Sequence, residues 1–145
     1  MVAVAEPIVR KRLSQAELDV ICARHDRLFQ ARPGGARAVF AWLDLTGLSL
    51  KGRNLADADF SAACLVGCDL SGAKLDNANF FGSDMQDAVL ADASLRRADL
   101  RGACLRGADL SGADLFEADL REGTIAAKDA KLGFRVVEAR KRADT

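Results

Sequence analysis

Apolar residues recur at every fifth position from Phe40 to Ile125, over 18 consecutive positions that we call centres. The residue two places before a centre, the small site, is usually Ala, Cys, Ser or Gly. A straight helix is excluded, because five helical residues turn a side chain by about 140°. A straight strand is excluded too, because an odd step sends successive centres to opposite faces. The chain must therefore turn a corner in every repeat, with the centre and the small site facing a thin core.

Two further positions of the repeat support this interpretation. The corner site, two residues after a centre, is often Gly, as at Gly47, Gly52 and Gly67. Glycine accepts the positive φ or the close backbone approach that a tight corner demands. The preceding site, one residue before a centre, is often Asp or Asn and is expected to face outward. Periodicity and turn chemistry thus predict the same short-repeat solenoid.

A family resemblance rests on two runs: Ala98-Asp99-Leu100-Arg101-Gly102 and Ala108-Asp109-Leu110-Ser111-Gly112. They resemble pentapeptide repeats, and the resemblance covers residues 38–125. It implies an all-β solenoid, a right-handed quadrilateral β-helix with one repeat on each side of the coil. Phe40, Phe60 and Phe80 point to the same coil length, because they lie twenty residues apart and would stack in one column.

An N-terminal α-helical cap is expected before the repeats, because an open β-helix end exposes unpaired backbone groups. Ser14 and Glu17 form a capping-box pattern, and apolar residues follow helical spacing from Leu18 until Pro33. We therefore divide the chain into three parts: an N-terminal tail and capping helix (1–37), the pentapeptide-repeat β-helix (38–125), and a C-terminal cap or dimerisation tail (126–145).

Large residues occupy the small site only in the first coil: Leu43, Leu48 and Arg53. We expect Leu43, Leu48 and the neighbouring Trp42 to meet the capping helix. Arg53 is too costly to bury unpaired. It is therefore expected to reach the rim, toward Glu17 or Asp19.

The C-terminal tail holds one apolar cluster: Leu132, Phe134, Val136 and Val137. These residues either cover the last coil or form a subunit interface. The sequence leaves both alternatives open, since an uncovered β-helix end is also a surface for a second chain. The resemblance adds the expectation of a homodimer through the C-terminal end, because related proteins often dimerise there.

The side chains do not converge on a catalytic, cofactor-binding or metal site. His25 falls on the apolar face of the capping helix and is interpreted as structural. Cys64 and Cys104 lie two coils, about 9.6 Å, apart, beyond the reach of a disulfide. Ligands strung along a flat column cannot enclose a tetrahedral ion, and a narrow rod filled with apolar side chains has no cleft. We predict no enzyme, no cofactor and no metal.

Charge is balanced overall but unevenly distributed along the chain. Residues 41–125 carry eight Lys or Arg against fourteen Asp or Glu, whereas both ends are basic. The run Arg140-Lys141-Arg142 is interpreted as a solvated tail, so DNA binding is not expected. No stretch reaches transmembrane length and the start does not resemble a signal peptide, so we expect no membrane span and a cytoplasmic protein.

Two outward surfaces compete as a binding site, and the first is an acidic column: Asp59, Asn79, Asp99 and Asp119. The resemblance implies how such a column could act, because quinolone-resistance members of the family imitate DNA and bind a topoisomerase. In this chain the acids spread over all sides and arginines interleave with them. A solvated, hydrogen-bonding surface is therefore the favoured interpretation of these acids.

The second surface mixes outward aromatic and basic residues: Phe81, Arg96, Arg97, Arg101, Arg106, Phe116 and Arg121. These residue types are enriched at protein interfaces. Cation–π contacts and salt bridges that merely join coils would use the same residues. Both interpretations stay open at this point.

The sequence thus predicts a non-enzymatic pentapeptide-repeat protein of bacterial cytoplasm, acting as a rigid protein–protein interaction module with an unknown protein partner. The alternative is a DNA-mimicking protein that binds gyrase, of the quinolone-resistance type.

Overall fold

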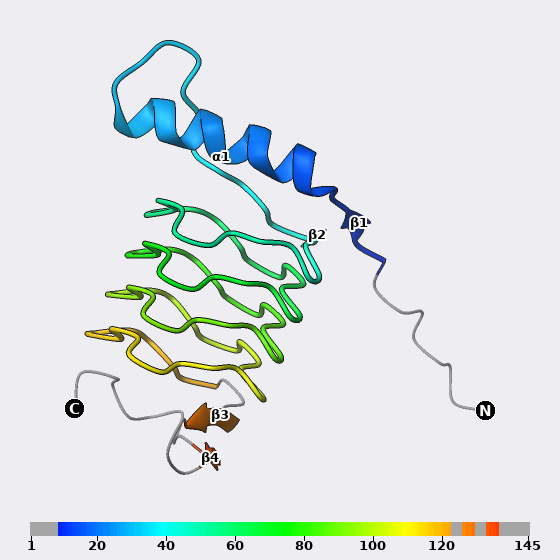
Figure 1. Cartoon of the computed structure of the whole chain (residues 1–145), viewed down its shortest axis with the longest axis vertical. Coiled ribbons are helices and arrows are strands. Elements are labelled where there is room, and N and C mark those ends of the chain that lie inside the picture. Colours follow the sequence, from blue (N-terminus) through cyan, green and yellow to red (C-terminus); the bar gives the residue numbers. More distant parts are fainter. Residues whose placement is uncertain (1–8, 123–125, 130–132, 137–145) are drawn as a thin grey trace.

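A computed structural model of the chain describes residues 9–122, 126–129 and 133–136 (Figure 1). The described segments contain one helix and four short strands, in the order β1 (Lys11–Arg12), α1 (Gln15–Phe29), β2 (Leu43–Asp44), β3 (Ala126–Asp129) and β4 (Gly133–Val136). Strand β1 pairs in parallel with β2, and β3 pairs antiparallel with β4. The repeats between β2 and β3 form the stack of coils that dominates Figure 1.

Parallel β-bridges join residues twenty positions apart throughout the repeats. Each bridge lies at a preceding site and brings two backbone hydrogen bonds. The N–H of Asp59, for example, donates to the carbonyl of Ala38 at 3.0 Å, and the carbonyl of Asp59 accepts the N–H of Phe40 at 2.7 Å. The chain therefore forms a solenoid-like stack with four repeats in each twenty-residue coil, and the coil length expected from the three phenylalanines is confirmed.

Every corner site from Trp42 to Glu122 has a positive φ, between 54° and 74°. A hydrogen bond closes each turn from Trp42 to Glu117, as when the N–H of Leu48 donates to the carbonyl of Leu45 at 3.0 Å. Eight of these corners are Gly, whereas nine carry a side chain. A side chain in this left-handed region costs roughly 1 kcal/mol. The solenoid therefore imposes the corner conformation even where the local sequence opposes it.

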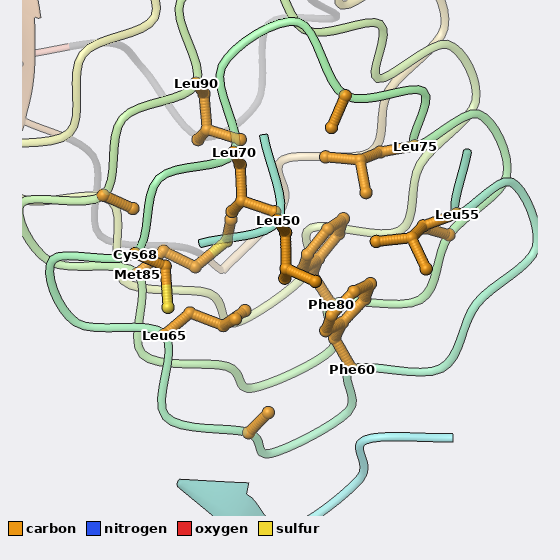
Figure 2. Close-up of a cluster of buried hydrophobic side chains, with 14 of the residues drawn as sticks. Leu50, Leu55, Phe60, Leu65, Cys68, Leu70, Leu75, Phe80, Met85 and Leu90 are labelled. Atoms are coloured by element: carbon orange, nitrogen blue, oxygen red, sulfur yellow. The ribbon is translucent and has the colours of Figure 1, made fainter. Parts of the chain in front are cut away.

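Centres and small sites fill the interior, as Figure 2 shows. The centres from Phe40 to Leu105 are at most 1% exposed. Phe40, Phe60 and Phe80 stack as predicted, with ring centroids 5.0 and 4.8 Å apart. The small sites from Ala58 to Ala108 are also buried and are mostly Ala, so the interior is closed by side chains of matched size.

Helix α1 lies across the N-terminal end of the coils (Figure 1). Its N-terminus carries the predicted capping box, in which the Ser14 side chain accepts from the Glu17 N–H and the Glu17 side chain accepts from the Ser14 N–H. Its residues Leu18 and Cys22 are buried in one apolar cluster with the centres. Leu43 and Leu48 pack against this cluster, partly buried.

The segment around α1 also pairs with the backbone edge of the first coil. The Leu13 N–H donates to the carbonyl of Asp44 at 3.0 Å, beside the β1–β2 pair. The Gln15 amide makes two bonds with the backbone of Ser49, both of 2.9 Å. His25 Nδ1 accepts the N–H of Ala38 at 2.9 Å. Backbone groups on three sides of the first coil thus find a partner in this segment.

The two remaining expectations for the first coil have opposite outcomes. Arg53 reaches the rim as predicted, with its Nη2 3.0 Å from Asp19 Oδ1 and its Nη1 4.0 Å from Asp26. The expectation that Trp42 meets the helix is wrong, because its side chain is 57% exposed. Trp42 occupies a corner site, with a φ of 62°.

The cysteines behave as apolar or surface thiols. Cys22 and Cys68 are buried, and desolvation raises the pKa of their thiols to about 11 and about 12 respectively. Cys64 and Cys104 are half-buried, and all four thiols are free. In the described part of the chain, α1 is too short and too polar to cross a membrane.

The corner conformation yields a stability prediction. We expect Gly82→Ala to lower the free energy of unfolding by about 1 kcal/mol. Gly82 has a φ of 64° and no atom lies within 4 Å of an added Cβ, so backbone strain is the only cost. Ala62→Gly, in the same corner column, is the matched reverse change. It should stabilise by a smaller amount, because Gly also adds entropy to the unfolded chain. Urea unfolding measures both, and a Gly82→Ala variant as stable as the parent would contradict a left-handed corner.

Candidate interaction surface

Aspartate and asparagine side chains at the preceding sites accept hydrogen bonds from the backbone. All ten such residues in the described repeats place Oδ1 on the N–H of the residue two places further on. Asp59 also accepts from the Ser61 hydroxyl, at 2.7 Å. This is the local geometry of an Asx turn. The recurrent acid is therefore first a structural acceptor for the turn that follows it.

The acidic column of Asp59, Asn79, Asp99 and Asp119 is therefore not an open strip of carboxylates. Asn79 makes the same backbone contact as the aspartates, so the contact needs no charge. Asp99 is held by the Arg101 guanidinium at 2.8 Å, and this hydrogen bond is the main cause that lowers the pKa of its carboxyl group. Arg121 lowers the pKa of Asp119 in the same way, at 2.7 Å.

Arg101 also joins the acidic column to Phe81. Its guanidinium carbon lies 5.4 Å from the centroid of the Phe81 ring, and its Nε lies 3.9 Å from Asp119 Oδ2. Phe81, Arg101 and Asp119 lie on successive coils of one side of the solenoid. The group thus links three coils by cation–π and charge contacts.

A second group forms around Phe116 on the adjacent side. Arg96 lies 4.8 Å from the Phe116 ring centroid and pairs with Asp114 at 3.2 Å. Arg97 lies 6.0 Å from the same ring and pairs with Glu117 at 3.1 Å. In residues 9–122, the structure gives exposed Arg106 no ion pair or ring contact. Six of the seven residues of the mixed surface therefore have a partner within the chain.

The apolar cluster expected in the C-terminal tail falls only partly within the described residues. Phe134 and Val136 belong to β4, and their side chains are not described. Leu132 and Val137 lie outside the described residues. Covering of the last coil and dimerisation both stay predictions.

His25 is buried, and histidine is a residue type that often serves in acid–base chemistry or metal binding. Its Nδ1 accepts the Ala38 N–H, so the neutral ring carries its proton on Nε2, which has no hydrogen-bond partner in the described structure. Burial lowers its pKa and outweighs smaller contributions from the Ala56 backbone and Asp26. Its ring packs 4.9 Å from that of Phe29. The described residues hold no group of three or more His, Cys, Asp and Glu that could bind a metal ion.

Sequence reasoning placed Phe81 on the outer surface but missed the exposure of Val39 and Trp42, nearer the N-terminal end. Val39 is 51% exposed, Trp42 57% and Phe81 49%. A signal was present in the register, because Val39 occupies a preceding site where Asp or Asn is usual. Trp42 likewise occupies a corner where Gly is usual. The two departures belong to the same repeat.

Comparison with known protein families gives one match. A family model described as pentapeptide repeats, in 8 copies, matches residues 36–72, 54–90, 73–112 and 93–123. The overlapping matches cover more than half of the chain. Among curated proteins, the comparison finds no significant match.

Solved structures similar to this chain include two from cyanobacteria. HetL, a pentapeptide repeat protein involved in heterocyst differentiation regulation in Nostoc sp. strain PCC 7120, is 32% identical over 69% of this chain, with a TM-score of 0.61. The match covers 50% of HetL. The pentapeptide repeat protein alr5209 of the same strain is 28% identical, over 72% of this chain and 77% of its own, with a TM-score of 0.57. QnrB1, a plasmid-mediated fluoroquinolone resistance protein, matches at 19% identity over 61% of this chain and 53% of its own. The TM-score of this match is 0.36.

Asp99 allows the backbone contact and the charge to be separated. Asp99→Asn keeps an acceptor for the Arg101 N–H, as Asn79 does naturally, but removes the ion pair. We expect it to be less stable than the parent by at most about 1 kcal/mol at pH 7. A lowered carboxyl pKa stabilises above the ordinary value of about 4, and this contribution is lost as the pH falls through the lowered folded value. The difference between the two proteins should therefore vanish on acidification.

Asp99→Ala is the control, because it removes the acceptor as well. It should cost more than Asp99→Asn at every pH, and urea unfolding between pH 7 and pH 2 measures both. Equal costs for the two variants would show that the turn does not use the side-chain acceptor.

Proposed function

Because the chain belongs to the pentapeptide-repeat family, we propose that it is a non-enzymatic, rigid interaction module that binds another protein through its outward side chains. The observation that carries this proposal is the continuous set of parallel bridges from Val39 to Asp119. Each coil is fixed to the next on every side, so outward positions keep a constant spacing whatever residue occupies them. A surface of this kind suits recognition of a partner without a change of shape.

We infer the finer architecture from the same contacts. The coil is a right-handed quadrilateral β-helix, α1 acts as its N-terminal cap, and the three parts of the chain are residues 1–37, 38–125 and 126–145. The backbone contacts of Gln15 and His25 and the ion pair of Arg53 support the assignment of the cap. The cyanobacterial source of HetL and alr5209 supports a bacterial origin, and we propose a cytoplasmic setting.

The interior supports a role in binding rather than in catalysis. The centres and small sites occupy it with apolar side chains, and catalysis needs polar groups that converge in a cleft. Six residues of the mixed surface already have partners within the chain, so we propose that these six mainly stabilise the contacts between coils. The exposed face of Phe81 is the part of this surface that remains open to a partner, and Arg106 is exposed on another side.

We propose in addition that the chain forms a homodimer through its C-terminal end. The apolar residues Phe134 and Val136 lie on β4, which pairs only with β3 in the described structure. Light scattering should give twice the mass of the chain. A double variant, Phe134→Ser with Val136→Ser, and a truncation after Ile125 should both give the monomer mass. A monomeric parent protein would exclude the dimer, and a dimeric truncation would place the interface elsewhere.

The alternative, a DNA mimic that binds gyrase, makes a different prediction. A mimic needs free carboxylates in regular array, whereas Asp99 and Asp119 are paired with arginines. We therefore expect the purified protein at micromolar concentration to leave supercoiling by gyrase unchanged, with or without a quinolone. Inhibition, or protection from the quinolone, would favour the mimic. Asp99→Asn is the matched variant for this assay, because it removes one negative charge and keeps the side-chain acceptor for the Arg101 N–H.

A further inference from the structure

Two features of Trp42 are unfavourable for folding, and packing within the solenoid does not explain them. Its φ is 62°, in the left-handed region that bulky residues rarely adopt, and its side chain is 57% exposed to solvent. The coils that follow it carry Ala62, Gly82 and Gly102 at the same corner. Folding alone would therefore favour a small residue here. A strained and exposed aromatic residue points instead to a role in binding.

Trp42 belongs to a larger apolar surface on one side of the solenoid. The Trp42 N–H donates to the carbonyl of Ser61, and the Ala62 N–H donates to the carbonyl of Phe81. These bonds place Phe81 two coils, about 10 Å, from the level of Trp42. In the coil between the two aromatic residues lie Ser61 and Ala62, where the Arg10 side chain reaches the carbonyl of Ala62, and Val39 completes the group in the first coil. We call these five residues the N-terminal platform.

Arginines border the N-terminal platform at both corners. The Arg10 Nε donates to the carbonyl of Ala62 at 2.6 Å, and the Arg37 Nε donates to the carbonyl of Asp57. Neither arginine has an ion pair in the described structure, whereas Arg101 and Arg121, further along the same side, are both paired with aspartates. Residues 9–40 as a whole carry seven Lys or Arg against three Asp or Glu. A partner approaching this end therefore meets positive charge beside an apolar surface.

We propose that the N-terminal platform docks an acidic segment of a partner protein. One apolar side chain of that segment packs between Trp42 and Phe81, and its carboxylates face Arg10 and Arg37. The proposal rests on the proposed function, since it names the site and the partner chemistry of the interaction module. It combines the aromatic residues that dominate protein interfaces with unpaired arginines that fit carboxylates in two-point geometry.

Nucleic acid fits the N-terminal platform less well, although tryptophan and arginine also bind bases and phosphates. Val39 offers no ring for stacking. Asp57, at the corner that Arg37 contacts, and Asp59 repel any anion. A nucleic acid carries a charge at every nucleotide, whereas a short peptide can keep its few carboxylates beside the arginines. Residues 41–125 are also acidic as a whole, with eight basic against fourteen acidic residues. A carboxylate-bearing peptide needs only the two corners, where the arginines lie.

The test uses the full chain and a displayed library of random 12-residue peptides. Peptides selected on the protein should be enriched in Asp and Glu around an apolar residue. Trp42 is the only tryptophan of the chain, so its emission reports contact at the site directly. A selected peptide should shift this emission to the blue and protect it from acrylamide. Selection of basic or uncharged peptides, or binding that leaves the emission unchanged, would overturn the proposal.

Trp42→Gly separates a binding role from a packing role. Gly adopts the corner φ without strain, so this variant should unfold at the same or a higher urea concentration than the parent, yet bind the selected labelled peptide at least tenfold more weakly. Arg37→Gln should weaken the same peptide several-fold. Arg106→Gln is the matched control, because Arg106 is also an unpaired arginine of the described structure but lies on another side. A lower unfolding midpoint for Trp42→Gly would make Trp42 a packing residue and refute the proposal.

The outcomes also separate this proposal from the proposed function. If the selected peptides bind Trp42→Gly as tightly as the parent but lose affinity for Arg106→Gln, the chain is an interaction module that uses another surface. If no peptide is enriched, both proposals fail. Quenching of Trp42 by labelled oligo-dT, or an emission shift that depends on protein concentration alone, would identify a nucleic acid or a second copy as the occupant and overturn the acidic partner.

Discussion

A corner every five residues is the constraint on which the rest of this structure depends. Each corner places one residue at positive φ and lets the next short extended piece bridge the coil on either side, twenty residues away. Because the backbone of each coil is held by its neighbours, only the centre and the small site face the interior. Large centres beside alanines then fill it completely, as the stacked rings of Phe40, Phe60 and Phe80 illustrate.

The same constraint decides how the polar residues are used. An outward N–H follows every centre, and an Asp or Asn at the preceding site accepts it. The carboxylates of the acidic column thus accept hydrogen bonds that stabilise the turns. Two of them, Asp99 and Asp119, are also neutralised by an arginine two residues later. Acidic residues recur at this site because the turn needs an acceptor, so their regular spacing gives little information about binding partners. Departures from the repeat are more informative.

Those departures gather at the N-terminal end. Leu43 and Leu48 are large where the repeat is otherwise small, and they pack against the cluster that includes residues of α1. Gln15 and His25 supply backbone partners that a further coil would otherwise provide. Trp42 departs in another sense, because neither α1 nor the coils bury it. One end of the solenoid-like stack therefore combines backbone contacts from the α1 segment with an exposed aromatic residue and an excess of basic charge.

The sequence by itself determined the register, the coil length, the capping box and the ion pair of Arg53 with the helix. Each follows from local spacing or from the cost of burying one group. Only the tertiary structure decided that Trp42 faces solvent, that non-glycine corners share the left-handed conformation, and that Phe81 and Phe116 stack on arginines. These outcomes depend on which side chains lie one coil apart in space, and on coil contacts strong enough to override local preference. A pattern read along one chain contains neither.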